Sequence, residues 1–249
     1  MDEEEIRIIY EYKSIKECAD VWLELCNILK REGLLSERYE IDERGFKITK
    51  IEKLLEEETS FNINDQFFEF TFGSVWSAEI QQLIITRQKK FEVNWDIWIE
   101  NLSQYGIFVN AWKFNGEYTY WQNRRQIDSY KRENRPYEHL PMKESGDPLP
   151  LPQIVIDTSK NPGRNVFRKG YVEAVGSSMW LGDKFFALTG ADKEKVMKVD
   201  WLEVEEIKPG IIKIKAQEEC FTEFEGREAE LQNKLRDLLY PNHEMDLEV

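Results

Sequence analysis

The residues best suited to nucleophilic chemistry lie in the stretch Gly176-Ser-Ser-Met-Trp180. A hydroxyl that follows a short apolar strand and a glycine is typical of the sharp turn that presents a catalytic serine, and Ser178 has this position. That turn also needs glycine two residues after the serine, where this chain has Trp180. No base is well placed, because His139 lies in a proline-rich segment and His243 lies beyond the last predicted helix. We therefore predict no catalytic residues and no serine hydrolase.

Metal and phosphate motifs are absent from the sequence. It has no Cys-x-x-Cys pair, no His-x-x-x-His pair, no calcium-loop spacing and no glycine-rich phosphate loop. Asp96 and Glu100 are four residues apart and could form half of a carboxylate site on a helix. On an otherwise apolar helix we interpret them as its solvent face. We therefore expect no metal ligands and no cofactor.

A basic, aromatic-rich stretch runs from Trp121 to Tyr137. Between Arg124 and Arg135 it holds five basic and two acidic residues. Arginines neutralise phosphates and aromatic rings stack on bases, so such a loop could bind single-stranded nucleic acid. The net charge of the chain is −14, however, and repels a phosphate backbone. We favour a solvated loop that pairs with the chain's own carboxylates.

Residues 200–230 have the opposite sign, with ten acidic and four basic residues. Aromatic side chains stand among the carboxylates. Negative charge speeds the encounter with a basic partner protein, and aromatic rings anchor that partner once it is bound. The alternative is that these carboxylates form a solvated face around a core hairpin. We predict a partner-binding site composed of Glu203, Glu205, Glu206, Glu218, Glu219, Glu223, Glu225 and Trp201.

Composition excludes several other classes. Hydrophobic residues make up 41% of the chain and aromatic residues 13%, which argues against disorder. No apolar run approaches the 18 or so residues of a membrane span, and the acidic start does not resemble a secretory signal. The three cysteines lack a paired short spacing and indicate reduced thiols. We therefore expect a cytoplasmic protein, with its oligomeric state left open.

Hydrophobic periodicity predicts an α+β fold, with a mainly antiparallel sheet and helices packed on one side. Apolar residues recur at helical spacing over residues 15–29 and 95–105, and a last helix is predicted over residues 225–240, opened by Thr222-x-x-Glu225 and stopped by Pro241. The pair Asn115-Gly116 predicts a hairpin between residues 107–114 and 117–121. Residues 171–175 form a predicted strand, and Trp180 is expected on the way into a helix that begins at Asp183.

Proline content divides the chain. Six of the eight prolines lie in residues 122–165, where dense regular structure is unfavourable. We therefore predict an N-terminal α+β half (residues 1–121), a proline-rich and partly basic connection (122–165), and a C-terminal α+β half (166–249).

The chain resembles small acidic α+β immunity proteins of bacterial polymorphic toxin systems. The resemblance rests on its size, its acidity, its lack of catalytic residues, and its second half around Gly176-Ser-Ser-Met-Trp-Leu-Gly182 with the closing helix. The resemblance implies a toxin–antitoxin role, in which the chain inhibits a cognate toxin by tight binding. It would be a non-catalytic cytoplasmic protein with a basic protein as its partner. Two alternatives are a small-molecule enzyme with a carboxylate and aromatic cleft between the halves, and nucleic-acid binding through residues 121–137.

Overall fold

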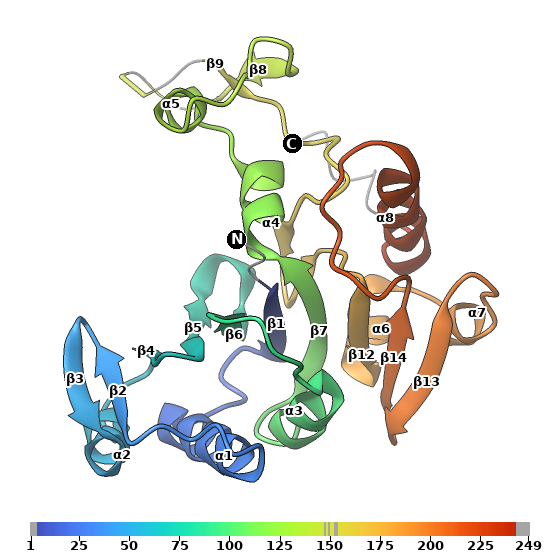
Figure 1. The fold of residues 1–249 in the computed structure, drawn as a ribbon. Coiled ribbons are helices and arrows are strands. Elements are labelled where there is room, and N and C mark those ends of the chain that lie inside the picture. The colour runs from blue at the N-terminus through green and yellow to red at the C-terminus, as the bar shows by residue number, and fades with distance from the viewer. Residues whose placement is uncertain (1–3, 147, 149, 152–153, 243–249) are drawn as a thin grey trace.

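The computed structural model describes residues 4–146, 148, 150–151 and 154–242. This part of the chain has the predicted α+β architecture (Figure 1), dominated by one large antiparallel sheet. The ten strands of that sheet, in spatial order, are β13 (Glu203–Lys208), β14 (Ile211–Lys215), β12 (Ser178–Gly182), β7 (Phe108–Asn115), β1 (Glu4–Glu11), β6 (Ile80–Arg87), β5 (Phe68–Val75), β4 (Phe61–Asn64), β2 (Arg38–Ile41) and β3 (Arg44–Lys47).

Helices cover different faces in the two parts of this sheet. The side chains of α1 (Cys18–Arg31), α2 (Ile48–Leu55) and α3 (Trp95–Leu102) pack into a first core against strands from β2 to β14. The side chains of α6 (Asp183–Thr189), α7 (Lys193–Met197) and α8 (Gly226–Leu239) pack into a second core. Alternate residues of β7, such as Ala111 and Trp112, enter different cores, as expected for neighbours on a strand. The two cores therefore lie on opposite faces of one sheet, so helices cover both faces and not one side as the sequence predicted.

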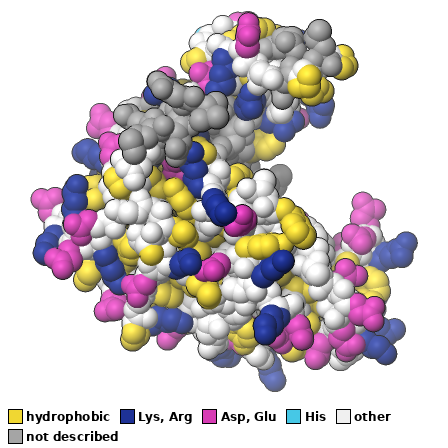
Figure 2. Space-filling model, turned by 180° about the vertical axis from the view of Figure 1, so that it is seen from behind, with side chains coloured by type: hydrophobic (Ala, Val, Ile, Leu, Met, Phe, Trp, Pro, Cys, Tyr) yellow, Lys and Arg dark blue, Asp and Glu magenta, His cyan; other side chains and the backbone are white. Residues whose placement is uncertain are grey.

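The chain leaves the sheet at the end of β7, forms α4 (Gly116–Asn123), and returns to the sheet at β12. The connection (residues 122–165) begins at the end of α4 and contains α5 (Ile127–Arg132) and the paired strands β8 (Met142–Glu144) and β9 (Ile154–Ile156). A second small sheet, β10 (Val166–Arg168) with β11 (Tyr171–Glu173), precedes β12, and a single 3-10 turn (Trp76–Ala78) joins β5 to β6. Seen from behind (Figure 2), the part with α5, β8 and β9 projects beyond the body, and a hollow lies beneath it.

The hairpin predicted at Asn115-Gly116 is wrong. Asn115 ends β7 and its side-chain oxygen accepts a hydrogen bond from the Tyr118 amide at 2.8 Å, so it caps α4. Asparagine is favoured both in tight hairpins and at helix N-termini, so the local pattern does not separate the two. The partners of β7 are β1 and the distant β12.

The stretch that resembles a catalytic turn is instead a site of close strand contact. A Cβ atom at Gly176 would lie 2.4 Å from the backbone oxygen of Lys113, and one at Gly182 would lie 2.9 Å from that of Phe108. Both contacts are to β7, so the two glycines let the chain approach β7 closely at either end of β12.

Trp180 lies in the middle of β12, between Ala111 of β7 and Lys213 of β14, and not in the lead-in to α6. Its indole nitrogen donates a hydrogen bond to the Asp96 carboxylate at 2.8 Å, and the Lys213 ammonium donates to the same carboxylate at 2.6 Å. Asp96 therefore joins α3 to two strands, and the prediction that it only faces solvent is wrong.

Replacing Trp180 with alanine should lower the free energy of unfolding by about 3–5 kcal/mol, because a large side chain with 1% exposure leaves a cavity. The matched control is Trp76→Ala, since Trp76 is 75% exposed and its loss should cost less than about 1 kcal/mol. Urea denaturation followed by far-UV circular dichroism measures both. Equal losses for the two variants would contradict the assignment of Trp180 to the core.

Gly176→Ala should destabilise the protein by about 1–3 kcal/mol, because the new methyl group collides with the backbone of β7. Gly73→Ala serves as the control, since a Cβ atom there meets the Cβ atom of Ser60 at 3.4 Å, an ordinary contact. Thermal melting of the two variants beside the wild type provides the comparison. If Gly176→Ala melts no earlier than Gly73→Ala, the close approach of β12 to β7 is not a constraint.

Candidate functional site

The predicted acidic site falls on the hairpin of β13 and β14 and on residues 217–225, which lead into α8. We use the term acidic face for the exposed side chains of Glu203, Glu205, Glu218 and Glu219. Lys215 brings two of them together, since its ammonium lies 2.8 Å from the Glu203 carboxylate and 2.6 Å from that of Glu218. Lys215 therefore connects the hairpin to the loop after it.

The cations in this region lie beneath the carboxylates. The side chains of Lys213 and Lys215 are only 18% and 20% exposed, whereas those of Glu203 and Glu218 are 76% and 79% exposed. Lys213 is held between Asp96, at 2.6 Å, and Glu205, at 3.3 Å. The lysines thus order the carboxylates from below, and the outer layer of the surface remains acidic.

Hydrogen bonds fix the charge states of this cluster. The carboxylates of Glu203 and Glu218 raise the pKa of Lys215 above its ordinary value. The hydrogen bond from Lys215 in turn lowers the pKa of Glu218. Near neutral pH both partners are therefore charged, and the cluster holds more anions than cations.

The remaining predicted residues are less closely associated with this cluster. Glu206 accepts a hydrogen bond from the Gly210 amide within the hairpin turn, at 3.3 Å. Trp201 is half-buried and packs against the second core, so it is not an exposed anchor. Glu223 and Glu225 are exposed beside Phe224, on the loop that enters α8.

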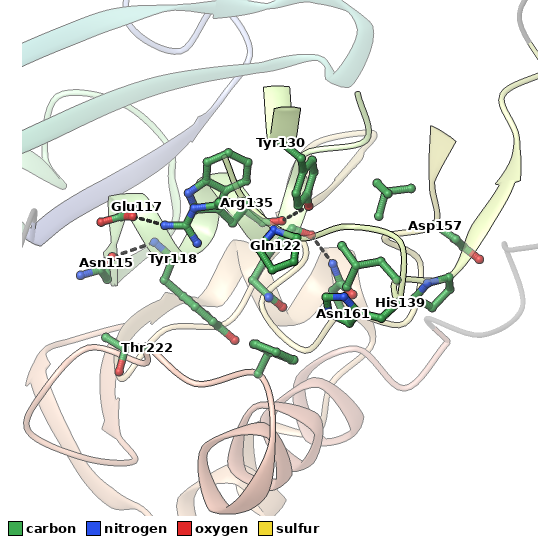
Figure 3. A pocket seen from close by; sticks show the side chains of 16 residues that line it. Asn115, Glu117, Tyr118, Gln122, Tyr130, Arg135, His139, Asp157, Asn161 and Thr222 are labelled. Carbon is green, nitrogen blue, oxygen red and sulfur yellow. Dashed lines mark hydrogen bonds and ion pairs between the residues drawn. The ribbon is translucent and has the colours of Figure 1, made fainter. Parts of the chain in front are cut away.

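A cleft of about 490 Å³ lies next to that loop and was not predicted in this place. Figure 3 shows it between α4, the connection and the residues before α8. Its wall combines aromatic, aliphatic and polar side chains from Asn115, Glu117, Tyr118, Trp121, Gln122, Tyr130, Arg135, Pro136, His139, Leu140, Pro141, Ile156, Asp157, Asn161, Thr222 and Phe224. This size and mixed lining are typical of ligand sites in proteins.

One end of the cleft holds a paired guanidinium group. Arg135 points toward Glu117 and forms an ion pair with it (Figure 3). The guanidinium carbon of Arg135 also lies 4.3 Å from the centre of the Trp121 ring, a cation–π contact. A cation of the basic stretch is therefore bound to the chain's own carboxylate and ring.

The other end of the cleft contains His139, Asp157 and Asn161 (Figure 3). Lys143 lies 2.8 Å from the Asp157 carboxylate, and its hydrogen bond lowers the pKa of Asp157 to about 2. The Asn161 side chain donates to the backbone oxygen of Gln122 at 2.8 Å. Asp157 and Asn161 thus hold the connection in place.

Hydrogen bonds also tie the walls of the cleft to one another. The Tyr118 hydroxyl of α4 donates a hydrogen bond to the backbone oxygen of Glu223 at 3.1 Å. It also lies 3.1 Å from the side-chain oxygen of Gln232 in α8. Beneath them, the guanidinium of Arg236 forms a buried ion pair with Glu173 at 2.6 Å and donates to the Arg164 oxygen at 2.7 Å. The cleft is therefore built from elements that are fixed relative to one another.

The other sequence candidates lie apart from this cleft. Ser178 is buried within β12, and His243 falls outside the described residues. Burial raises the pKa of Cys18 to about 11 and the pKa values of Cys26 and Cys220 to about 12, so all three free thiols are protonated near neutral pH. In the described part of the chain, no group of histidine, cysteine, aspartate or glutamate side chains could hold a metal ion.

The same part of the chain has no helix with the length and apolar character needed to cross a membrane.

No protein family and no curated protein matches the sequence. Among solved structures, the chain is distantly similar to the Pseudomonas aeruginosa T6SS protein PA0821, with 8% sequence identity and a TM-score of 0.49. That alignment covers 95% of this chain and 73% of the other.

Proposed function

We propose that this chain is a non-catalytic, cytoplasmic binding protein of the immunity type, which inhibits a basic partner protein, a cognate toxin, by covering it with the acidic face. The proposal combines the sequence resemblance with the surface chemistry of the β13–β14 hairpin. The partner that binds the acidic face is a protein with a positively charged surface.

The observation that carries the proposal is that the carboxylates at this hairpin are more exposed than the lysines that pair with them. Glu203 and Glu218 extend outward, while Lys215 lies beneath and between them. An incoming cation meets carboxylates first, and the less exposed ammonium of Lys215 already restricts their conformations. Side chains that are ordered before binding lose less entropy on association, so the arrangement favours a specific complex.

The position of the acidic face at the edge of the sheet supports the same function. β13 is the last strand in the sheet order and, in the described part of the chain, pairs only with β14. Its exposed glutamates make pairing of two such edges unfavourable, because like charges would meet. A basic protein surface does not encounter this repulsion. The edge therefore selects against self-association and in favour of a cationic partner.

Replacing Glu203, Glu205, Glu218 and Glu219 with glutamine should slow association with the isolated basic partner, because long-range attraction steers the encounter. Raising the salt concentration should slow the wild type as well, since ions screen charges beyond about 8–10 Å. Surface plasmon resonance across a salt series measures both effects. The folded state should persist, because exposed ion pairs contribute little to stability.

A matched four-fold variant carries Glu37, Glu52, Glu56 and Glu57 as glutamine. These residues are exposed near the opposite end of the sheet, so the net charge changes equally while the acidic face stays intact. Association should then remain much closer to the wild-type rate. If the two variants slow association equally, only net charge matters and the acidic face has no special role.

A further inference from the structure

The cleft beside α4 (Gly116–Asn123) already binds a guanidinium group, and that group belongs to the chain itself. Arg135 lies over Trp121 and forms an ion pair with Glu117. The side chains of Arg135 and Glu117 nevertheless remain 43% and 49% exposed. Cation–π contacts and ion pairs in such wet surroundings are weak, so a competing cation can replace Arg135.

The ring and the carboxylate belong to one helix. Glu117 and Trp121 are four residues apart in α4, so they lie on the same side of the helix. Tyr130 packs edge-on against the Trp121 ring at 4.8 Å and donates its hydroxyl to the Trp121 backbone oxygen at 3.3 Å. Arg135, in contrast, comes from the loop after α5. Tyr130 therefore supports the Trp121 ring independently of the Arg135 guanidinium.

The cleft has space for a longer side chain than this ring and carboxylate alone require. Its volume of about 490 Å³ extends past Arg135 along the apolar side chains of Pro136, Leu140 and Ile156. Aliphatic stems of arginine and lysine pack well on such surfaces while the charged end reaches a polar group. Thr222 and Phe224 form another wall, and they follow Glu218 and Glu219 of the acidic face within a few residues.

We propose that this cleft is the anchor site for an arginine side chain of the partner protein, and that Arg135 fills it in the free protein as an internal competitor. The inference rests on the proposed function, because it takes the basic partner as the occupant. When the partner binds, its guanidinium stacks on Trp121 and pairs with Glu117, and Arg135 moves into solvent. The acidic face then attracts the partner, and the cleft fixes its orientation.

The test uses N-acetyl-arginine amide as the probe and the indole N–H signal of Trp121 in nitrogen-15 NMR spectra as the readout. Trp121→Phe identifies that signal. In Arg135→Ala the probe should shift it saturably, with an affinity about tenfold tighter than in the wild type if Arg135 fills the site about nine-tenths of the time. The neutral citrulline analogue should produce no such shift.

Two further variants complete the test. Arg132→Ala removes the same charge from an exposed position of α5 and should retain the wild-type affinity. Adding Glu117→Gln to Arg135→Ala should abolish the gain, and the spectra of the same samples report whether the fold is intact. Equal affinities of Arg135→Ala and the wild type, or binding that is indifferent to Glu117→Gln, would overturn the proposal.

These outcomes separate the two proposals, because the probe is a small molecule. If the arginine derivative fails to bind, the proposed anchor site is rejected, whereas the proposed role of the acidic face is not affected. If association with the partner does not depend on salt, the proposed role of the acidic face is rejected, whereas arginine binding in the cleft is not affected.

Discussion

The pairing of β7 with β12 determines how the rest of this structure is arranged. β7 ends the first part of the chain and β12 begins 63 residues later, yet their hydrogen bonds place both in one sheet. The segment between them must leave the sheet and return, which produces the projecting connection. The same pairing separates the two cores onto opposite faces and puts the acidic hairpin at the far edge.

Both candidate binding features follow from this constraint. Lys213 of β14 and Trp180 of β12, the strand between β7 and β14, both donate to Asp96 of α3 and so join the second half to the first. The cleft arises where the returning connection passes α4 and α8 and is held there by Arg236. Acidic face and cleft are therefore products of one junction, and the loop with Thr222 and Phe224 joins them.

Local patterns predicted much of the secondary structure. The apolar periodicity of residues 15–29 matches α1, and the start and stop signals around residues 225–240 match α8. Gly176 was misinterpreted because its reason is a neighbouring strand that lies far away in sequence. For the same reason the cleft was not predicted. The stretch that contains Trp121 and Arg135 meets Phe224 only through the fold. Acidity was visible in the sequence, whereas the burial of Lys213 and Lys215 beneath it was not.

The most direct test of the central claim is hydrogen–deuterium exchange of this chain, alone and in complex with a basic protein purified with it from its native cells. Binding should slow exchange in β13, in residues 217–225 and in α4, because these surround the acidic face and the cleft. Exchange in β2, β3 and α2 at the opposite edge should stay unchanged. Protection confined to that opposite edge would contradict the account.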